Sequence, residues 1–175
     1  MKSMPKPTKA DRPKKKKVKT NRQKLILEIS DLCRKLTTWR DGCICVLCEV
    51  DGGRCNDVSQ WGHVIPQGAS GYLKHNLSNS FRQCGSHNII HKTNQAIYLN
   101  WYRRKFGNLA FEMLTEASKK TCHKFTTPDL WEMRDELKDL VGKTYLMAGA
   151  GIADLVYQGY YGSIIREAWI KEGRI

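Results

Sequence analysis

The sequence predicts a small α+β protein in which a zinc-stapled core is flanked by α-helices and preceded by a disordered basic arm. Apolar residues recur at helical spacing on both sides of the central region. That region, residues 43–94, is rich in Gly, Asn and Ser and carries two cysteine/histidine pairs at metal-ligand spacing. The first 23 residues are strongly basic and hold almost nothing that a core could bury. The 175 residues suffice for one domain.

Most of the basic charge lies in the N-terminal arm. The formal net charge is +13, and residues 1–24 hold 11 of the 30 basic residues against one acid, Asp11. With three prolines and a lysine block, residues 1–23 are expected to be disordered when alone. Clustered lysines release counterions from nucleic-acid phosphates, which favours a phosphate-binding arm over a merely solubilising tail. The arm residues expected to contact nucleic acid are Lys14, Lys15, Lys16 and Lys17.

Helical periodicity predicts four helices outside the central region. They cover about residues 24–39, 95–106, 109–118 and 127–141. The last of them opens at Thr127, which is expected to be its N-cap, with Pro128 at the first helical position. Residues 142–175 are apolar and contain several glycines, and further helices are expected there. The organisation that follows is a tail (1–23), a central unit with flanking helices (24–141) and a C-terminal helical extension (142–175).

Composition also excludes some classes of protein. No stretch of 18 apolar residues exists, so a membrane span and a membrane partner are not expected. The first 24 residues lack the apolar run of a secretory signal. Seven cysteines without a secretory route indicate thiol or metal chemistry in a reducing compartment, and a cytoplasmic location is expected.

Two cysteine/histidine pairs predict a structural Zn²⁺ site. Cys45 and Cys48 enclose two residues, and Cys84 and His87 repeat that spacing after 35 intervening residues. Each pair is expected on a tight turn, so that all four side chains point at one tetrahedral ion. The competing interpretation is a set of buried cysteines in a small core.

The other cysteines are weaker candidates for metal binding. Cys43 is an alternative to Cys45 in a wider loop, and Cys55 complicates the choice of ligands. Cys33 lies on the apolar face of the first predicted helix and is expected in the core. Cys122, next to His123, is expected to be structural or exposed.

Residues between and after the two pairs resemble the HNH, or ββα-metal, nucleases. His63-Val64-Ile65-Pro66, preceded by Trp61-Gly62, resembles the hairpin motif that carries the general-base histidine of that family. Asn79 matches the loop asparagine, and Asn88 matches the last signature position. Within the HNH family the chain is most similar to the NinG (Rap) recombination proteins of phage lambda, over roughly residues 24–141. The resemblance implies a zinc-stapled ββα core, and with it the strands of the α+β class.

The resemblance also implies catalytic roles for His63, Asn79 and Asn88. Phosphodiester hydrolysis needs an activated water, and a histidine whose pKa is near neutrality suits the task of general base. His63 would be that base, and Asn79 would orient its segment through the side-chain amide. Taken alone, without its neighbours, His63 would be interpreted as a core or zinc-ligating histidine.

The expected catalytic ion, Mg²⁺ or Mn²⁺, has few ligands. Asn88 and His91 would hold it weakly, and Asp57 or a backbone carbonyl is left open as a further ligand. Many HNH proteins carry Asp or His immediately before the general base, whereas this chain has Gly62 there. His91 stands where related proteins often have a basic residue, so contact with phosphate is its alternative role.

A long window of the chain contains no carboxylate side chain. From Val58 to Phe111 there is no Asp or Glu, which is the pattern of a surface that faces a polyanion. The competing explanation is chance in a module rich in Asn and Ser. The basic residues expected to contact nucleic acid in this window are Arg82, Lys92, Arg103 and Arg104. The aromatic residues Tyr98, Trp101 and Tyr102 are expected to pack the helix rather than stack on bases.

Together these features predict a metal-dependent DNA endonuclease of HNH type. The resemblance suggests branched recombination intermediates as substrates, in a phage protein that works in the bacterial host cytoplasm. A non-catalytic zinc module that binds DNA is the first alternative, and Gly62 keeps it open. A site-specific HNH enzyme of the homing or restriction kind is the second, although no added recognition domain is evident. A homodimer is also left open.

Overall fold

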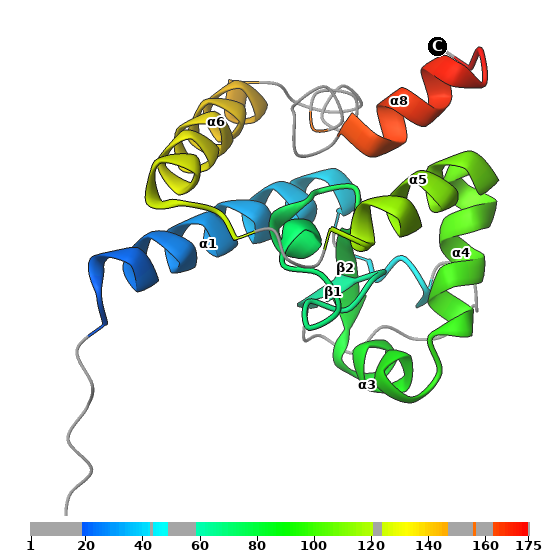
Figure 1. The fold of residues 1–175 in the computed structure, drawn as a ribbon. Helices are drawn as coiled ribbons and strands as arrows, with labels where there is room; N and C mark the ends of the chain where they lie inside the picture. Colours follow the sequence, from blue (N-terminus) through cyan, green and yellow to red (C-terminus); the bar gives the residue numbers. More distant parts are fainter. Residues whose placement is uncertain are drawn as a thin grey trace, which may run out of the picture.

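The structure is a computed structural model that describes residues 19–42, 44–48, 59–120, 124–146, 156 and 163–174. Its helices surround a small two-stranded sheet (Figure 1). The α+β class is therefore confirmed, with most of the described residues helical. Within the described residues, no helix is both long and apolar enough to cross a membrane. Several residues considered above lie outside the described ranges: Lys14–Lys17, Cys43, Cys55, Asp57, Cys122 and His123.

Helix α1 spans Asn21–Asp41 and so begins earlier than its apolar periodicity predicts. A capping box explains the extra residues. The Thr20 hydroxyl accepts from the Gln23 backbone N–H at 3.2 Å, and the Gln23 side chain accepts from the Thr20 N–H at 2.9 Å. These two bonds satisfy N–H groups that a helix start leaves unpaired, and they require no apolar side chain. The helix ends at Gly42, whose φ of 72° favours glycine.

The sheet pairs β1 (Ser59–His63) with β2 (Ser80–Cys84) in antiparallel orientation. The register places Gln60 opposite Gln83 and Gly62 opposite Phe81. A short 3-10 helix, η2 (Tyr72–His75), lies in the segment of the chain that connects the two strands. Helix α3 (Gly85–Thr93) follows β2 directly, with Cys84 as its N-cap residue.

The remaining described helices cover the sheet and α1. They are α4 (Ala96–Phe106), α5 (Asn108–Ser118), α6 (Thr127–Leu146) and α8 (Ser163–Lys171). The cap expected for α6 is wrong by one residue. The Asp129 side chain accepts from the Thr126 N–H at 2.5 Å, and the Thr126 hydroxyl accepts from the Asp129 N–H at 3.3 Å. Thr126 is therefore the N-cap residue, and Pro128 lies at the second helical position rather than the first. The helix also continues past residue 141, to Leu146.

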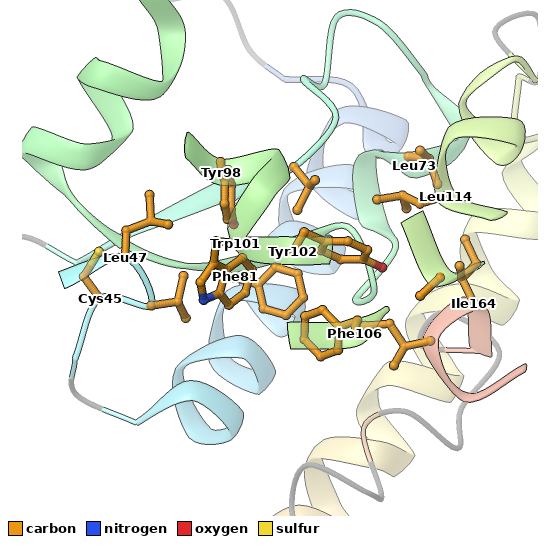
Figure 2. Close-up of a cluster of buried hydrophobic side chains, with 14 of the residues drawn as sticks. Cys45, Leu47, Leu73, Phe81, Tyr98, Trp101, Tyr102, Phe106, Leu114 and Ile164 are labelled. Carbon is orange, nitrogen blue, oxygen red and sulfur yellow. The ribbon is translucent and has the colours of Figure 1, made fainter. Parts of the chain in front are cut away.

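An aromatic core lies between the sheet and the helices that follow it (Figure 2). Phe81 of β2 contacts Trp101 edge-on at a ring-centroid distance of 4.9 Å and stacks on Phe106 at 5.2 Å. Tyr98 and Tyr102 are fully buried in the same cluster. Their assignment as packing residues, together with Trp101, is therefore confirmed.

A second core lies between α1 and α6, which run side by side (Figure 1). It contains Ile29 and Leu36 from α1 and Met133 and Leu137 from α6, all of them buried. Cys33 lies in this core with no exposed surface, as its helical position predicts.

The C-terminal end of α1 is fixed to the sheet by a buried ion pair. Arg40 and Asp41 have side chains only 1% and 6% exposed and form two hydrogen bonds, at 2.5 and 2.9 Å. Arg40 also donates to the carbonyl oxygens of Leu77 and Ser80, and Asp41 accepts from the Arg82 backbone N–H. Because every charged atom has a partner here, removing either residue would leave an uncompensated buried charge.

Candidate metal centre and catalytic cleft

Three segments of the chain bring the predicted zinc ligands together. Cys45 and Cys48 lie on the turn after α1, which is joined to the sheet by the Val46 N–H donating to the Arg82 carbonyl at 3.1 Å. Cys84 ends β2, and His87 lies in the first turn of α3. The close approach of a turn, a strand end and a helix start thus depends on the β1–β2 register.

The four side chains form a cluster with the dimensions of a tetrahedral metal site. Their ligand atoms all lie within 4.8 Å of one another. His87 Nδ1 is 3.6 Å from the Cys45 sulfur and 3.3 Å from each of the Cys48 and Cys84 sulfurs, and the last two sulfurs are 3.8 Å apart. Tetrahedral Zn²⁺ with its usual bond lengths separates sulfur ligands by about 3.8 Å and a sulfur from a nitrogen by about 3.5 Å. The cluster could therefore hold a metal ion such as zinc.

His63, at the end of β1, is held by backbone acceptors, the carbonyl groups of Lys74 and Trp61. Its Nε2 donates to the carbonyl oxygen of Lys74 in η2 at 2.9 Å. This bond fixes the tautomer in which Nδ1 carries the lone pair. The Gln67 amide Nε2 lies 3.2 Å from Nδ1 and can donate to it. Trp61 packs edge-on against the imidazole at a centroid distance of 4.4 Å.

The environment keeps His63 uncharged near neutral pH. Burial is the largest cause and lowers the pKa of His63 from 6.5 to about 4, and the charge of Lys74 acts in the same direction. The side chain is only 6% exposed. A neutral imidazole with a lone pair at Nδ1 can accept a proton. Its pKa of about 4 lies below the near-neutral value expected from the sequence, which makes it a weaker base than predicted.

Asn79 connects both segments that position His63. Its side-chain oxygen accepts from the Ile65 N–H at 2.8 Å, and its amide nitrogen donates to the carbonyl oxygens of Ile65 and Leu73 at 3.0 and 3.2 Å. Ile65 is two residues after His63, and Leu73 immediately precedes Lys74, whose carbonyl binds the imidazole. The Asn79 amide is fully buried and thereby sets the distance between the base and its acceptor.

Helix α3 forms the opposite wall of a cleft at His63. The cleft has a volume of about 440 Å³. Its lining includes the side chains of Trp61, His63, Gln67, Asn88, His91 and Lys92. Asn88 donates to the Gln60 side-chain oxygen, which leaves its own oxygen as an acceptor or ligand. His91 packs edge-on against Tyr98 at 4.7 Å, and burial lowers its pKa. Its Nε2 is buried without a hydrogen-bond partner among the described residues.

Gln83 occupies the space next to Gly62. A Cβ atom on residue 62 would lie 1.9 Å from the Gln83 side-chain oxygen and 2.4 Å from its Cδ. Gln83 is fully buried, and neither polar atom of its amide has a hydrogen-bond partner among the described residues. The Gln83 side chain in this position therefore leaves no room for a side chain on residue 62, and the cleft offers Asn88 and His91 as candidate ligands for a divalent ion.

A scan against protein-family models matches the chain over residues 2–144 to a single description, Bacteriophage Lambda NinG protein. The chain belongs to the NinG family. The family connects this NinG chain with phage recombination and agrees with the resemblance drawn from its motifs. No curated protein and no solved structure matches this NinG chain at a significant level.

The basic residues expected to contact nucleic acid occupy several places on this NinG protein. Lys92 lines the His63 cleft, and Arg82 lies on β2 with its guanidinium donating to the Gly42 carbonyl at 2.7 Å. Arg103 and Arg104 are exposed on α4, and the Arg103 guanidinium lies 4.0 Å from the ring centroid of Phe111. The structure thus places Lys92 beside His63 and the two α4 arginines away from the cleft lining.

Three functional candidates of this NinG protein were missed by sequence reasoning. Gln60 bonds Asn88, Gln67 covers the His63 lone pair, and Gln83 fills the space at Gly62. Glutamine carries no motif signal, and its role appears only through its partners. Gln60 and Gln83 are opposite each other in the sheet, and this pairing depends on a strand register that the sequence alone does not give.

Proposed function

We propose that this NinG protein is a metal-dependent DNA endonuclease of HNH type. The observation that carries the proposal is the orientation of His63: a neutral imidazole whose Nε2–H is held by the Lys74 carbonyl, beside the Gln67 amide, in a cleft walled by Asn88 and His91. The order β1, β2, α3 and the Cys₃His cluster at the β2–α3 junction support the ββα-metal architecture. Membership of a phage recombination-associated family suggests branched DNA as the substrate.

In this proposal His63 acts as general base. Its Nδ1 accepts a proton from the water that attacks phosphorus, and the Lys74 carbonyl stabilises the charge that develops on the ring through the Nε2–H bond. Asn79 keeps the ring and this carbonyl in place. Lys92 supplies positive charge at the cleft for the substrate phosphate.

The chemistry also needs a divalent ion, and the residues present fit a weakly bound one. When bound, Mg²⁺ or Mn²⁺ would stabilise the charge on the phosphate and on the leaving oxygen. Asn88 through its side-chain oxygen and His91 through its unpartnered Nε2 are the residues that would hold it. The unpartnered buried nitrogen of His91 is the observation that favours a ligand here, because such an atom costs free energy when nothing binds it.

The test of this proposal is a comparison of His63→Ala with the wild type on duplex, nicked, flap and four-way DNA with Mg²⁺ or Mn²⁺. His63→Ala should cleave about 10²–10⁴-fold more slowly, because that is the usual contribution of a general base. Its DNA affinity and bound metal should be unchanged, since the cluster ligands are other residues. His75→Leu is the matched control, because His75 is also buried but does not line the cleft.

Two results would overturn the proposal. If His63→Ala loses its structural metal and unfolds, His63 is structural. If the wild type cuts none of these DNA forms with either ion, a zinc-stabilised DNA-binding module is the better description. Gln83 beside Gly62 is the specific observation that favours this second candidate, since it removes one usual ligand position.

A further inference from the structure

A second cleft lies on the other side of Trp61 from His63. Six side chains from α1, β1 and β2 line it: Arg34, Thr37, Thr38, Gln60, Trp61 and Arg82. We refer to it as the Arg34 cleft. Its volume is about 190 Å³. Pockets for whole small molecules usually measure roughly 300–1,000 Å³, so the Arg34 cleft suits a single charged group rather than a metabolite.

The lining of the Arg34 cleft is cationic. It contains two arginines and no carboxylate. The nearest acids have other partners: Asp41 is bound in the buried pair with Arg40, and Asp31 makes an ion pair with Arg34 at 2.6 Å. That second pair is on the surface, with the two side chains 55% and 69% exposed. An exposed pair of this kind contributes about 0–1 kcal/mol, so an incoming anion can compete with Asp31 for Arg34.

The Arg34 cleft and the His63 cleft share a wall. Trp61 lines both of them, with the Arg34 guanidinium 5.8 Å from its ring centroid and the His63 imidazole 4.4 Å from the ring on the strand side. Gln60 makes a second connection, since it lines the Arg34 cleft and accepts from Asn88, which lines the His63 cleft. The two clefts are therefore neighbours, and one linear ligand could contact both.

We propose that the Arg34 cleft binds a backbone phosphate of a DNA strand whose adjacent segment enters the His63 cleft. The proposal rests on the proposed function, because it takes the ligand of the His63 cleft to be DNA. A phosphodiester carries one negative charge, fits a small cleft, and is matched by the two-armed donor geometry of arginine. Such a contact fixes the position of the strand without reading its sequence.

The test measures how DNA affinity depends on salt. Fluorescence anisotropy with a labelled four-way junction and a matching duplex, without added Mg²⁺ or Mn²⁺, gives the dissociation constant of wild type and Arg34→Gln over a range of salt concentrations. Loss of one phosphate contact should reduce the slope of log affinity against log salt by about one, with both DNA forms. Arg34→Lys should recover the slope, since it restores the charge. Arg134→Gln is the matched control, because Arg134 also pairs with an aspartate on a helix surface but lines neither cleft.

The outcomes separate this proposal from the nuclease proposal. If Arg34→Gln keeps the wild-type slope, the Arg34 cleft holds no phosphate, whether or not the wild type cleaves DNA with Mn²⁺. If the slope falls as expected while the wild type cleaves no DNA, the phosphate site stands and the nuclease proposal fails. An equal fall for Arg134→Gln would also overturn the site, because the effect would then come from net charge alone.

Discussion

At the scale of single residues, Gly62 and Gln83 behave as one unit. A methyl group on residue 62 would overlap the Gln83 amide, and Gln83 is fully buried, so its side chain has little room to move. Glycine at position 62 fits this arrangement, because the Gln83 side chain takes the volume that a Cβ atom would need. In the proposed site this leaves the binding of the divalent ion to Asn88 and His91 of α3.

This coupling predicts the result of a double-mutant cycle. Gly62→Ala should lower the free energy of unfolding by about 1–3 kcal/mol, the usual cost of overpacking. Gln83→Ala removes the overlapping atoms, so the double variant should be more stable than the two single losses imply. Urea denaturation of the four proteins measures the coupling. Purely additive losses would show that the two side chains do not compete for the same space.

A second residue-scale prediction concerns pH. Burial is the largest cause that lowers the pKa of His75 to about 3, against 6.5 in an unfolded chain, and the side chain is 3% exposed. Between these two values the unfolded chain binds more protons than the folded one, so the free energy of unfolding falls as the pH falls. The stabilising contribution of the neutral His75 to the free energy of unfolding is fully present above about pH 6.5.

His75→Leu should therefore weaken the pH dependence of stability. Between pH 6.5 and 5, the variant should lose about 1–2 kcal/mol less than the wild type. His63 also binds a proton more readily in the unfolded chain, and its charge acts on His75, so the difference between the two proteins reports on His75 together with its interaction with His63. Urea denaturation at a series of pH values gives the comparison, and parallel curves would contradict a neutral buried His75.

At the scale of elements, the metal cluster joins the turn after α1 to the β2–α3 junction. The turn is also held by the Val46 N–H, which donates to the Arg82 carbonyl, and by burial of its residues in the aromatic core. Because a structural metal contributes its binding free energy to folding, its ligands should matter far more than other buried cysteines.

Cys48→Ser and Cys33→Ala compare a proposed ligand with a buried cysteine of the α1–α6 core. The wild type should hold about one Zn²⁺ per chain, and Cys48→Ser should lose the ion together with the structure of the central module. Cys33→Ala should keep the ion and lose only about 1 kcal/mol of stability. Elemental analysis and circular dichroism measure both properties. An unchanged thermal midpoint for Cys48→Ser would remove the metal assignment.

Local patterns predicted the elements better than their contacts. Apolar spacing located α1, α4, α5 and α6 to within a few residues, because one face of each helix packs on a core. The cysteine spacing indicated the metal ligands, because two residues between ligands suit one tight turn. The pairing of α1 with α6, the Gly62–Gln83 contact and the Arg34 cleft join residues far apart in sequence, and no local pattern encodes such contacts.

At the scale of the whole molecule, the distribution of charge suits a polyanionic ligand. The window without carboxylates contains the described parts of β1 and β2 and all of α3 and α4, which together carry both walls of the His63 cleft and part of the Arg34 cleft. The acidic residues lie before and after it, on α1, α5 and α6 among others. DNA approaching the clefts would therefore meet mainly neutral and basic side chains.

The N-terminal arm should add affinity for DNA without taking part in the chemistry. Residues 1–18 hold eight basic residues and one acid, and their removal leaves Thr20 to cap α1. The shortened protein should bind every DNA sequence more weakly and with a salt slope reduced by several units, since several phosphate contacts are lost together, whereas Arg34→Gln should reduce it by about one. Cleavage at saturating protein should persist, because no residue of either cleft or of the metal cluster lies in the arm. Anisotropy over a range of salt concentrations, with a cleavage assay on the same preparations, tests both expectations. An unchanged affinity at low salt would show that the arm does not contact DNA and would favour a role for it in recruiting another protein.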